Sequence, residues 1–188
     1  MQEWENLEAS CKECNNCGLC NTRSHVVFGV GVKDADVLFV GEGPGEQEDL
    51  QGEPFVGAAG KLLDEMLCII DLDRKKNCYI ANIVKCRPPG NRDPKDEEQD
   101  ACIGYLHQQM ALIKPKIIVC LGRIAATKLI RPDYRITREH GQWECRDGIW
   151  MTAVYHPSAL LRDASKRPET FGDLISLREK IREVNAKM

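Results

Sequence analysis

The stretch DVLFVGEGPGEQED, residues 36–49, decides the fold class. Four consecutive apolar residues, Val37–Val40, lead into Gly41, which is typical of a strand buried on both faces of a parallel sheet. A loop rich in glycine and acid follows, and residues 58–70 then carry apolar side chains at helical spacing. A buried strand, a loop and a helix in this order predict the first unit of an α/β fold.

The same alternation continues along the chain. CYIANIV (78–84) and KIIVCLG (116–122) predict two further strands, and residues 139–155 predict a hairpin whose second arm is a fourth core strand. We therefore expect one domain over residues 1–188, an α/β/α sandwich with a mostly parallel, four-stranded central sheet. Ligands bind at the carboxyl ends of such strands, so the site should lie among the loops there, which include HPSALLR (156–162).

Composition limits the function classes. The 188 residues carry a formal net charge of −3, so any DNA binding must use a local basic patch. No apolar run is long enough to span a bilayer, and the polar, acidic start is unlike a signal peptide. We expect a cytoplasmic protein with no membrane partner. In that reducing compartment, ten cysteines indicate metal or redox chemistry more than disulfides.

The loop after the first strand admits two readings from its residues alone. It contains G-x-G-x-G, but it lacks both G-x-G-x-x-G and a following G-K-[ST], and its carboxylates would repel a phosphate. A solvated acidic turn explains the charges. It does not explain the glycines and Phe55, which indicate a backbone that approaches something flat.

Three segments in order carry a resemblance to a known family: GEGPGEQEDLQGEPFVGAAGKLL (41–63), ANIVKCRPPGNRDP (81–94) and HPSALLR (156–162). Together they resemble a family 4 uracil-DNA glycosylase, an iron–sulfur enzyme of DNA repair, from about Cys14 to about Arg162. The resemblance implies a monofunctional, monomeric enzyme that flips deoxyuridine out of single- or double-stranded DNA. It hydrolyses the N-glycosidic bond and leaves an abasic site.

The resemblance implies three residues that hold the base. Phe55 matches the stacking aromatic, and Asn82, a polar residue in an apolar strand, matches the amide that reads uracil O4 and N3–H. His156 matches the histidine that donates to uracil O2. Without the family match, these would be a core phenylalanine, an amide bonded to nearby backbone and a helix-capping histidine.

Two acids are candidates for placing the water that attacks the sugar. Family 1 enzymes carry an aspartate where this chain has Gly43, and family 4 commonly has a small residue there. We take Glu42 as the first candidate for placing water or stabilising the sugar cation. Glu48 is the second, implied to lie near the uracil and to help exclude the methyl group of thymine. One of the two acids can serve only to hold the loop.

The late loop is the predicted DNA contact. Leu160 or Leu161 would wedge into the space of the flipped base, and Ser158 and Arg162 would contact the DNA strand. Lys166 and Arg167 extend this basic patch.

Two features depart from relatives. The family often has basic residues where Glu53 and Ala58 stand, which predicts weaker or more salt-sensitive DNA binding. PPGNRD (88–93) lacks the histidine-bearing insertion of the covalent uracil-binding relatives, which predicts turnover.

The cysteines of CKECNNCGLC (11–20) are divided by the resemblance. Cys14 and Cys17 match two ligands of a [4Fe–4S] cluster that Cys86 and Cys102 complete, which leaves Cys11 and Cys20 as spares. The spacing does not fit a ferredoxin motif, whereas zinc held by four thiolates stays open from the residues alone. The remaining cysteines are expected to be buried small hydrophobes: Cys68, Cys78, Cys120 and Cys145.

Two rival functions follow from the same residues. A non-catalytic iron–sulfur relative would bind uracil or DNA without releasing the base, and an electron-transfer protein would reduce its cluster reversibly without binding DNA. Intact Phe55, Asn82 and His156 favour the enzyme.

Overall fold

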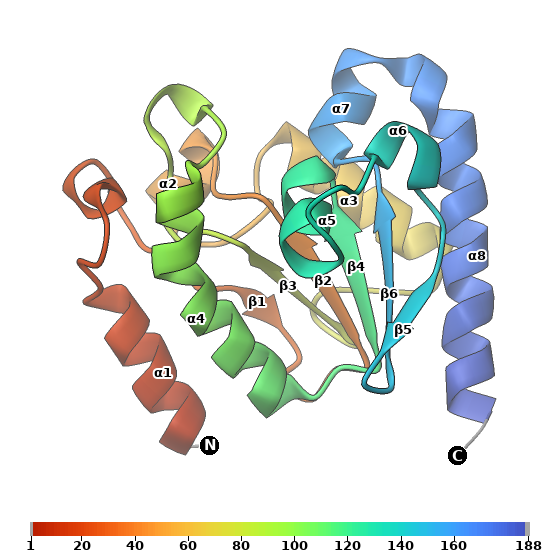
Figure 1. The fold of residues 1–188 in the computed structure, drawn as a ribbon, viewed down its shortest axis with the longest axis horizontal. Coiled ribbons are helices and arrows are strands. Elements are labelled where there is room, and N and C mark those ends of the chain that lie inside the picture. Colours follow the sequence, from red (N-terminus) through yellow and green to blue (C-terminus); the bar gives the residue numbers. More distant parts are fainter. Residues whose placement is uncertain (1, 187–188) are drawn as a thin grey trace.

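The centre of the molecule is a six-stranded sheet in the order β1-β3-β2-β4-β6-β5, seen in a computed structural model that describes residues 2–186 (Figure 1). The strands are β1 (Val30–Gly31), β2 (Val37–Gly41), β3 (Cys78–Asn82), β4 (Ile117–Leu121), β5 (Glu144–Arg146) and β6 (Ile149–Val154). The four inner strands are parallel, and β1 and β5 pair antiparallel at the edges. The α/β class is confirmed, but the predicted count of four strands is wrong. β5 is the first arm of the predicted hairpin and joins the sheet as an edge strand, whereas β1, with two residues, is too short to leave a periodic pattern in the sequence.

The register of the inner strands brings their carboxyl ends to one level. Gly41 at the end of β2 lies opposite Asn82 at the end of β3, and Leu121 of β4 lies opposite Val154 of β6. All five residues of β2, β3 and β4 are buried, as the continuous apolar runs predict. The loops that follow these strands therefore meet at a single edge of the sheet.

Helices cover both faces of the sheet, as predicted for a three-layer sandwich (Figure 1). The helices of one layer are α1 (Gln2–Lys12), α4 (Asp96–Ile113) and α5 (Arg123–Leu129), and those of the other are α3 (Ala58–Ile69) and α8 (Arg167–Ala186). Alternate residues of β2 serve the two cores: Leu38 and Val40 pack with the first layer, and Val37 and Phe39 pack with the second.

Short helices lie around the carboxyl edge of the sheet. They are α2 (Glu46–Gln51), α6 (Ile136–Glu139) and α7 (Pro157–Arg162), joined by the 3-10 turns η1 (Gly18–Asn21), η2 (Pro89–Asn91) and η3 (Ala164–Lys166). Figure 1 places α6 and α7 above the ends of β4 and β6. Within residues 2–186, none of the helices combines the length and apolar character that crossing a membrane requires.

Candidate active site

A cleft of about 540 Å³ opens at the carboxyl edge of the sheet. The loop after β2, the end of β3, the start of α5, part of α6 and the start of α7 all contribute to its walls. Most of the predicted active-site residues line it: Glu42, Gly43, Glu48, Phe55, Asn82, His156, Ser158 and Arg162. Segments that are more than a hundred residues apart in the chain thus meet in one cleft.

Asn82 ends β3 with its amide buried at the floor of the cleft. The residue is 1% exposed, and its Oδ1 has no hydrogen-bond partner among residues 2–186. A Cβ atom at the neighbouring Gly41 would lie 2.5 Å from Oδ1. The glycine therefore lets the amide approach the sheet, and the unpaired acceptor remains available to a ligand.

Phe55 covers the same glycine. The residue is 6% exposed, and a Cβ atom at Gly41 would lie 2.6 Å from its Cζ. Its φ of +54° lies in the left-handed region, which aromatic residues rarely adopt. Its ring lies 5.5 Å from the His156 ring, at an interplanar angle of 32°. The ring thus packs with the core between the sheet and α3 and also borders the cleft, in a conformation that is rare for an aromatic residue.

His156 presents one defined nitrogen to the cleft. Its Nδ1 accepts a hydrogen bond from the Ser158 backbone N–H at 3.1 Å, and the Ser158 hydroxyl lies 2.7 Å from the same nitrogen. Desolvation lowers the pKa of His156 to about 4, helped by Arg162 and opposed by Glu48. The ring is therefore neutral at pH 7. Because Nδ1 is an acceptor, the proton lies on Nε2, which is free to donate.

Glu42 and Glu48 follow the same strand but differ in environment. Desolvation, with a smaller contribution from nearby Asp93, raises the pKa of Glu42 to about 7, while Arg123 and Arg162 oppose the shift. A carboxyl with a pKa near neutrality can exchange protons at working pH. Glu42 is therefore the acid suited to proton transfer.

Glu48 is occupied by backbone amides. Its Oε1 accepts from the N–H groups of Val56 at 2.9 Å and Gly57 at 2.8 Å, and its Oε2 accepts from Gly45 N–H at 3.1 Å. The carboxylate thus ties the loop before α2 to the loop before α3. This arrangement fits the loop-holding role that sequence reasoning left open for one of the two acids.

Gly43 packs against the segment that follows β3. A Cβ atom there would lie 2.7 Å from Cγ2 of Val84. An aspartate at this position would overlap the valine unless the loop moved, so the small residue is a packing requirement of this chain.

The two candidate wedge residues of α7 point in different directions. Leu160 is 2% exposed and belongs to the core between the sheet and α3, whereas Leu161 is 46% exposed. The prediction that named Leu160 is therefore corrected: its side chain fills the core and cannot enter DNA without unpacking it. Ser158 also faces inward, toward His156, while Arg162 is exposed at the cleft rim.

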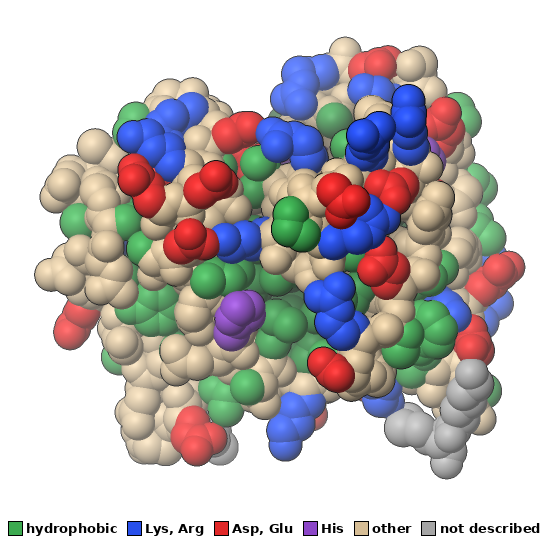
Figure 2. All heavy atoms as spheres, in the orientation of Figure 1, with side chains coloured by type: hydrophobic (Ala, Val, Ile, Leu, Met, Phe, Trp, Pro, Cys, Tyr) green, Lys and Arg blue, Asp and Glu red, His purple; other side chains and the backbone are tan. Residues whose placement is uncertain are grey.

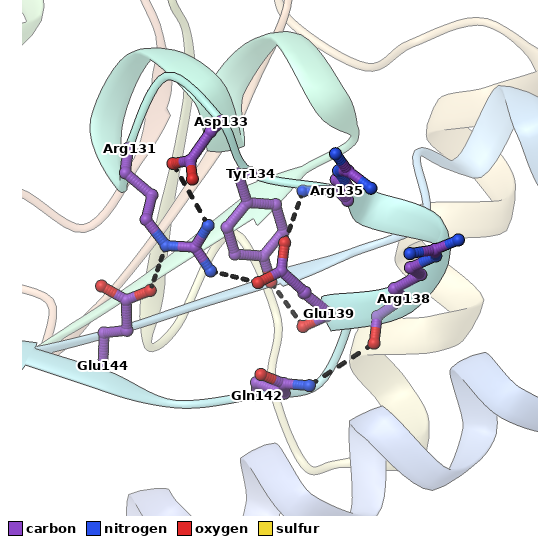
Figure 3. A network of polar contacts seen from close by, with 8 residues as sticks. All are labelled: Arg131, Asp133, Tyr134, Arg135, Arg138, Glu139, Gln142 and Glu144. Carbon is purple, nitrogen blue, oxygen red and sulfur yellow. Dashed lines mark hydrogen bonds and ion pairs between the residues drawn. The ribbon is translucent and has the colours of Figure 1, made fainter.

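A polar network holds the ends of α6 (Figure 3), the helix whose residues Ile136 and Thr137 line the cleft. Arg131 binds the carboxylates of Glu139 and Glu144, and Glu139 Oε2 also accepts from the Arg135 backbone N–H at 2.6 Å. The network fixes a short helix that has too few turns to be stable alone.

The cleft rim carries several cations. Figure 2 shows Lys and Arg side chains gathered, with some acids between them, over the end of the molecule that carries α5, α6 and α7. In Figure 3 the guanidinium groups of Arg135 and Arg138 point away from the network. Among residues 2–186 neither has a carboxylate partner, whereas Arg123 pairs with Asp93 at 2.7 Å. A local basic patch therefore exists despite the negative net charge.

The predicted cluster ligands gather away from the cleft, around a second, smaller cavity beside α1 and α4. Cys14, Cys17, Cys86 and Cys102 line it, together with the two cysteines predicted as spares, Cys11 and Cys20. Arg23 Nη1 donates to Cys86 Sγ at 3.3 Å, and the Lys85 backbone N–H donates to Cys102 Sγ at 3.3 Å. Such N–H···S bonds are typical around metal-binding thiolates.

The arrangement of the thiols bears on the kind of metal group. Within residues 2–186, no group of three or more His, Cys, Asp or Glu side chains is arranged so that it could hold a metal ion. Thiolates are ligands both of a [4Fe–4S] cluster and of a structural zinc ion, so these side chains are chemically suited to either group.

The comparison with protein families agrees with this geometry. A model of the uracil DNA glycosylase superfamily matches residues 28–177. The chain belongs to the uracil DNA glycosylase superfamily. The predicted family is therefore confirmed.

Curated relatives extend the match over nearly the whole chain. A type-4 uracil-DNA glycosylase of Archaeoglobus fulgidus is 42% identical over 189 residues, covering 95% of this chain and 94% of the relative. One of Thermotoga maritima is 44% identical over 156 residues, covering 82% of this chain and 81% of the relative. A type-5 uracil-DNA glycosylase of Pyrobaculum aerophilum is 30% identical, covering 69% of this chain and 64% of the relative.

Some residues of the site were not found by sequence reasoning. Asp93 and Arg123 line the cleft and shift the pKa of Glu42; Asp93 lies within the recognised segment 81–94 but was given no role there, and Arg123 begins α5, where no motif indicates it. Arg135 and Arg138 gave no signal because charged residues are common on short exposed helices. The expectation for the remaining cysteines is half wrong: Cys78 and Cys120 are buried, whereas Cys68 and Cys145 are exposed.

Proposed function

We propose that this chain is a DNA-repair glycosylase that flips deoxyuridine out of DNA, hydrolyses its N-glycosidic bond and leaves an abasic site. One observation carries the proposal: a single cleft holds an aromatic ring, a buried unpaired amide oxygen and a neutral imidazole N–H. The relatives named type-4 uracil-DNA glycosylases at 42% and 44% identity support it.

Recognition begins when the base leaves the duplex, at a cost of a few kcal/mol of lost stacking. Phe55 stacks on the flipped ring. Asn82 Oδ1 accepts from uracil N3–H, and the amide NH₂ donates to O4. Cytosine carries an acceptor at N3 and a donor at C4, which is the reverse pattern, so the buried amide rejects it.

Bond cleavage places negative charge on the departing base. The electrons of the C1′–N1 bond move into the uracil ring and collect at O2, where His156 Nε2–H donates a hydrogen bond. A neutral donor held in a desolvated site stabilises this anion without reorganising, an effect worth about 2.7–4 kcal/mol.

Water completes the reaction at the sugar. Glu42, in its ionised form, accepts the proton of the water whose oxygen bonds to C1′, and its charge also stabilises the oxocarbenium-like sugar. Glu48 holds the loop and keeps the pocket wall close to C5 of the base, where thymine carries its methyl group.

The DNA strand is held by the rim. Leu161 fills the space of the flipped nucleotide, and Arg162 and Lys166 contact phosphates, which carry most of the salt-dependent affinity. The basic groups of α6 compensate for Glu53 and Ala58, where relatives often carry cations. The enzyme acts as a monomer on uracil-containing DNA, and it turns over because no histidine stands in residues 88–93 to trap the sugar.

Cys14, Cys17, Cys86 and Cys102 would hold a [4Fe–4S] cluster. When bound, the cluster supplies cross-linking between the N-terminal segment, the loop after β3 and α4. It takes no part in the base chemistry, which the residues of the cleft perform.

The test uses an end-labelled oligonucleotide with one uracil, and matched strands with thymine or cytosine at that position. After incubation and alkali, we expect cleavage of the uracil strand alone. If the uracil strand stays intact while the protein is folded and binds it, the chain is a non-catalytic relative and the proposal is wrong.

A further inference from the structure

Arg74 lies outside the cleft and binds the backbone that carries Phe55. Its side chain is 8% exposed, in the loop between α3 and β3. Nη1 donates to the carbonyl of Pro54 at 2.8 Å, and Nη2 donates to the carbonyl of Phe55 at 2.9 Å. Nε donates to Asp64 Oδ1 at 2.8 Å, and Glu53 Oε1 lies 3.8 Å from Nη1. The planar fork is fixed by carboxylates and holds two successive carbonyls.

Phe55 needs such support. Its positive φ of 54° persists only where the surroundings determine it. Two contacts do so: Arg74 binds its carbonyl oxygen, and α3 passes directly against it at Gly60, where a Cβ atom would lie 1.9 Å from that oxygen. The ring consequently stays beside His156, with 5.5 Å between the ring centres.

We propose that Arg74 is a positioning residue for base recognition, whose anchored guanidinium holds Phe55 in the conformation that stacks on the flipped base. Arg74 does not line the cleft, so it acts through Phe55 alone. The inference rests on the stacking role proposed for Phe55. It also gives Glu53 a function: the acid that stands where relatives often carry a cation lies within reach of Arg74.

The chemistry requires arginine at this place. A lysine keeps the charge but offers one ammonium centre, so it cannot bind both carbonyls in a plane while also contacting Asp64. The ring would then sample other conformations and lose preorganisation for stacking. A displacement of about 1 Å at a substrate-positioning group can lower a rate about 10²-fold.

The test is a double-mutant cycle with Arg74→Lys and Phe55→Ala, read as the single-turnover rate of uracil release. We expect Arg74→Lys to lower the rate about tenfold when Phe55 is present and less than about twofold in the Phe55→Ala background. Equal losses in both backgrounds would overturn the proposal, because a general effect on the fold does not depend on the ring. Asp64→Asn, which removes the charged anchor of the fork, provides the same comparison if Arg74→Lys does not fold.

Arg146→Lys is the matched control. Arg146 Nη2 also donates to a backbone carbonyl, that of Ile130 at 2.7 Å, but it lies on β5, outside the cleft. The rate of uracil release by the Arg146→Lys variant should stay within about twofold of that of the parent protein. A loss as large as that of Arg74→Lys would overturn the inference, because any arginine–carbonyl bond would then suffice.

A readout without turnover separates this inference from the proposed function. Nuclear Overhauser contacts between the Phe55 and His156 rings should be present in the parent protein and lost in Arg74→Lys. If the parent releases no uracil but these contacts follow Arg74, the function fails and the positioning role stands. Contacts that persist in Arg74→Lys would overturn the positioning role even in an active enzyme.

Discussion

The cleft and the cysteine cavity are lined by residues close together in the chain, Asn82 and Cys86, yet their polar groups differ in hydrogen bonding. Asn82 reaches the cleft with an unpaired oxygen, whereas Cys86 and Cys102 in the cavity already accept N–H···S bonds. Lys85 lies between them: its Nζ donates to the Asn82 carbonyl at 3.1 Å, and its backbone N–H binds Cys102. An unpaired acceptor suits a ligand that binds and leaves, whereas thiols that already accept N–H···S bonds suit a group that stays bound.

The largest expected effect tests the cleft side of this comparison. His156→Ala should lower the rate of uracil release about 10²–10³-fold, because the anion at O2 loses its donor. The melting temperature should fall by only about 2–4 °C, because the variant loses the cap bond from Ser158 N–H at the start of α7, which is worth about 1 kcal/mol. Steady-state kinetics and calorimetry on the same preparations check this. A rate within tenfold of the parent would remove His156 from the mechanism.

The cavity side predicts the reverse pattern. Cys86→Ser should abolish iron–sulfur absorbance and lower stability, since a cross-link that closes a loop of this size is worth about 3–5 kcal/mol. Each kcal/mol lowers the melting temperature by about 2–4 °C. Cys20→Ser is the control and should keep the absorbance. Iron and sulfide contents of the two variants, measured under anaerobic conditions, show which cysteine is a ligand. If Cys20→Ser loses the absorbance and Cys86→Ser keeps it, the ligand assignment is wrong.

Titration of Glu42 should make both stability and activity depend on pH. Its raised pKa means that the folded protein retains a proton that the unfolded chain has released, so its contribution to stability is present below pH 4.5 and lost as pH rises to about 7. The base must be ionised, so kcat/KM should rise through the same range and level off above about pH 7. In Glu42→Gln the acidic limb near pH 7 should disappear. A limb that remains in this variant would assign it to another group.

The smallest expected effect separates two neighbouring leucines. Leu161→Ala should lower the rate on double-stranded DNA about threefold to tenfold, a loss of roughly 0.6–1.4 kcal/mol, and leave stability unchanged. Leu160→Ala should lower the free energy of unfolding by about 2–5 kcal/mol. Urea unfolding and single-turnover assays measure both. If Leu161→Ala proves the destabilising variant, the packing assigned to α7 is wrong.

The features that could be predicted from the sequence are those that leave a continuous local pattern. Four buried strands and the polar Asn82 inside one of them were visible because apolar runs and their interruptions are local signals. The edge strand β1 was not predicted, since two residues define no period, and β5 was expected only as the first arm of the hairpin. Leu160 and Leu161 are both apolar, so only the packed structure distinguishes the core residue from the exposed one. Asp93 and Arg123 act on Glu42 through tertiary approach: the segment 81–94 was recognised without showing that Asp93 faces Glu42, and no motif marks Arg123 at the start of α5.

The Glu48 carboxylate, held by three backbone amides, has a consequence for genome maintenance. In the proposed reaction Asn82 reads an imide edge that uracil shares with thymine, so hydrogen bonding alone cannot distinguish the lesion from this normal base. Discrimination then depends on the pocket wall staying closed by the width of one methyl group. Substitutions that loosen this loop would convert a repair enzyme into a mutator without touching any group that performs chemistry.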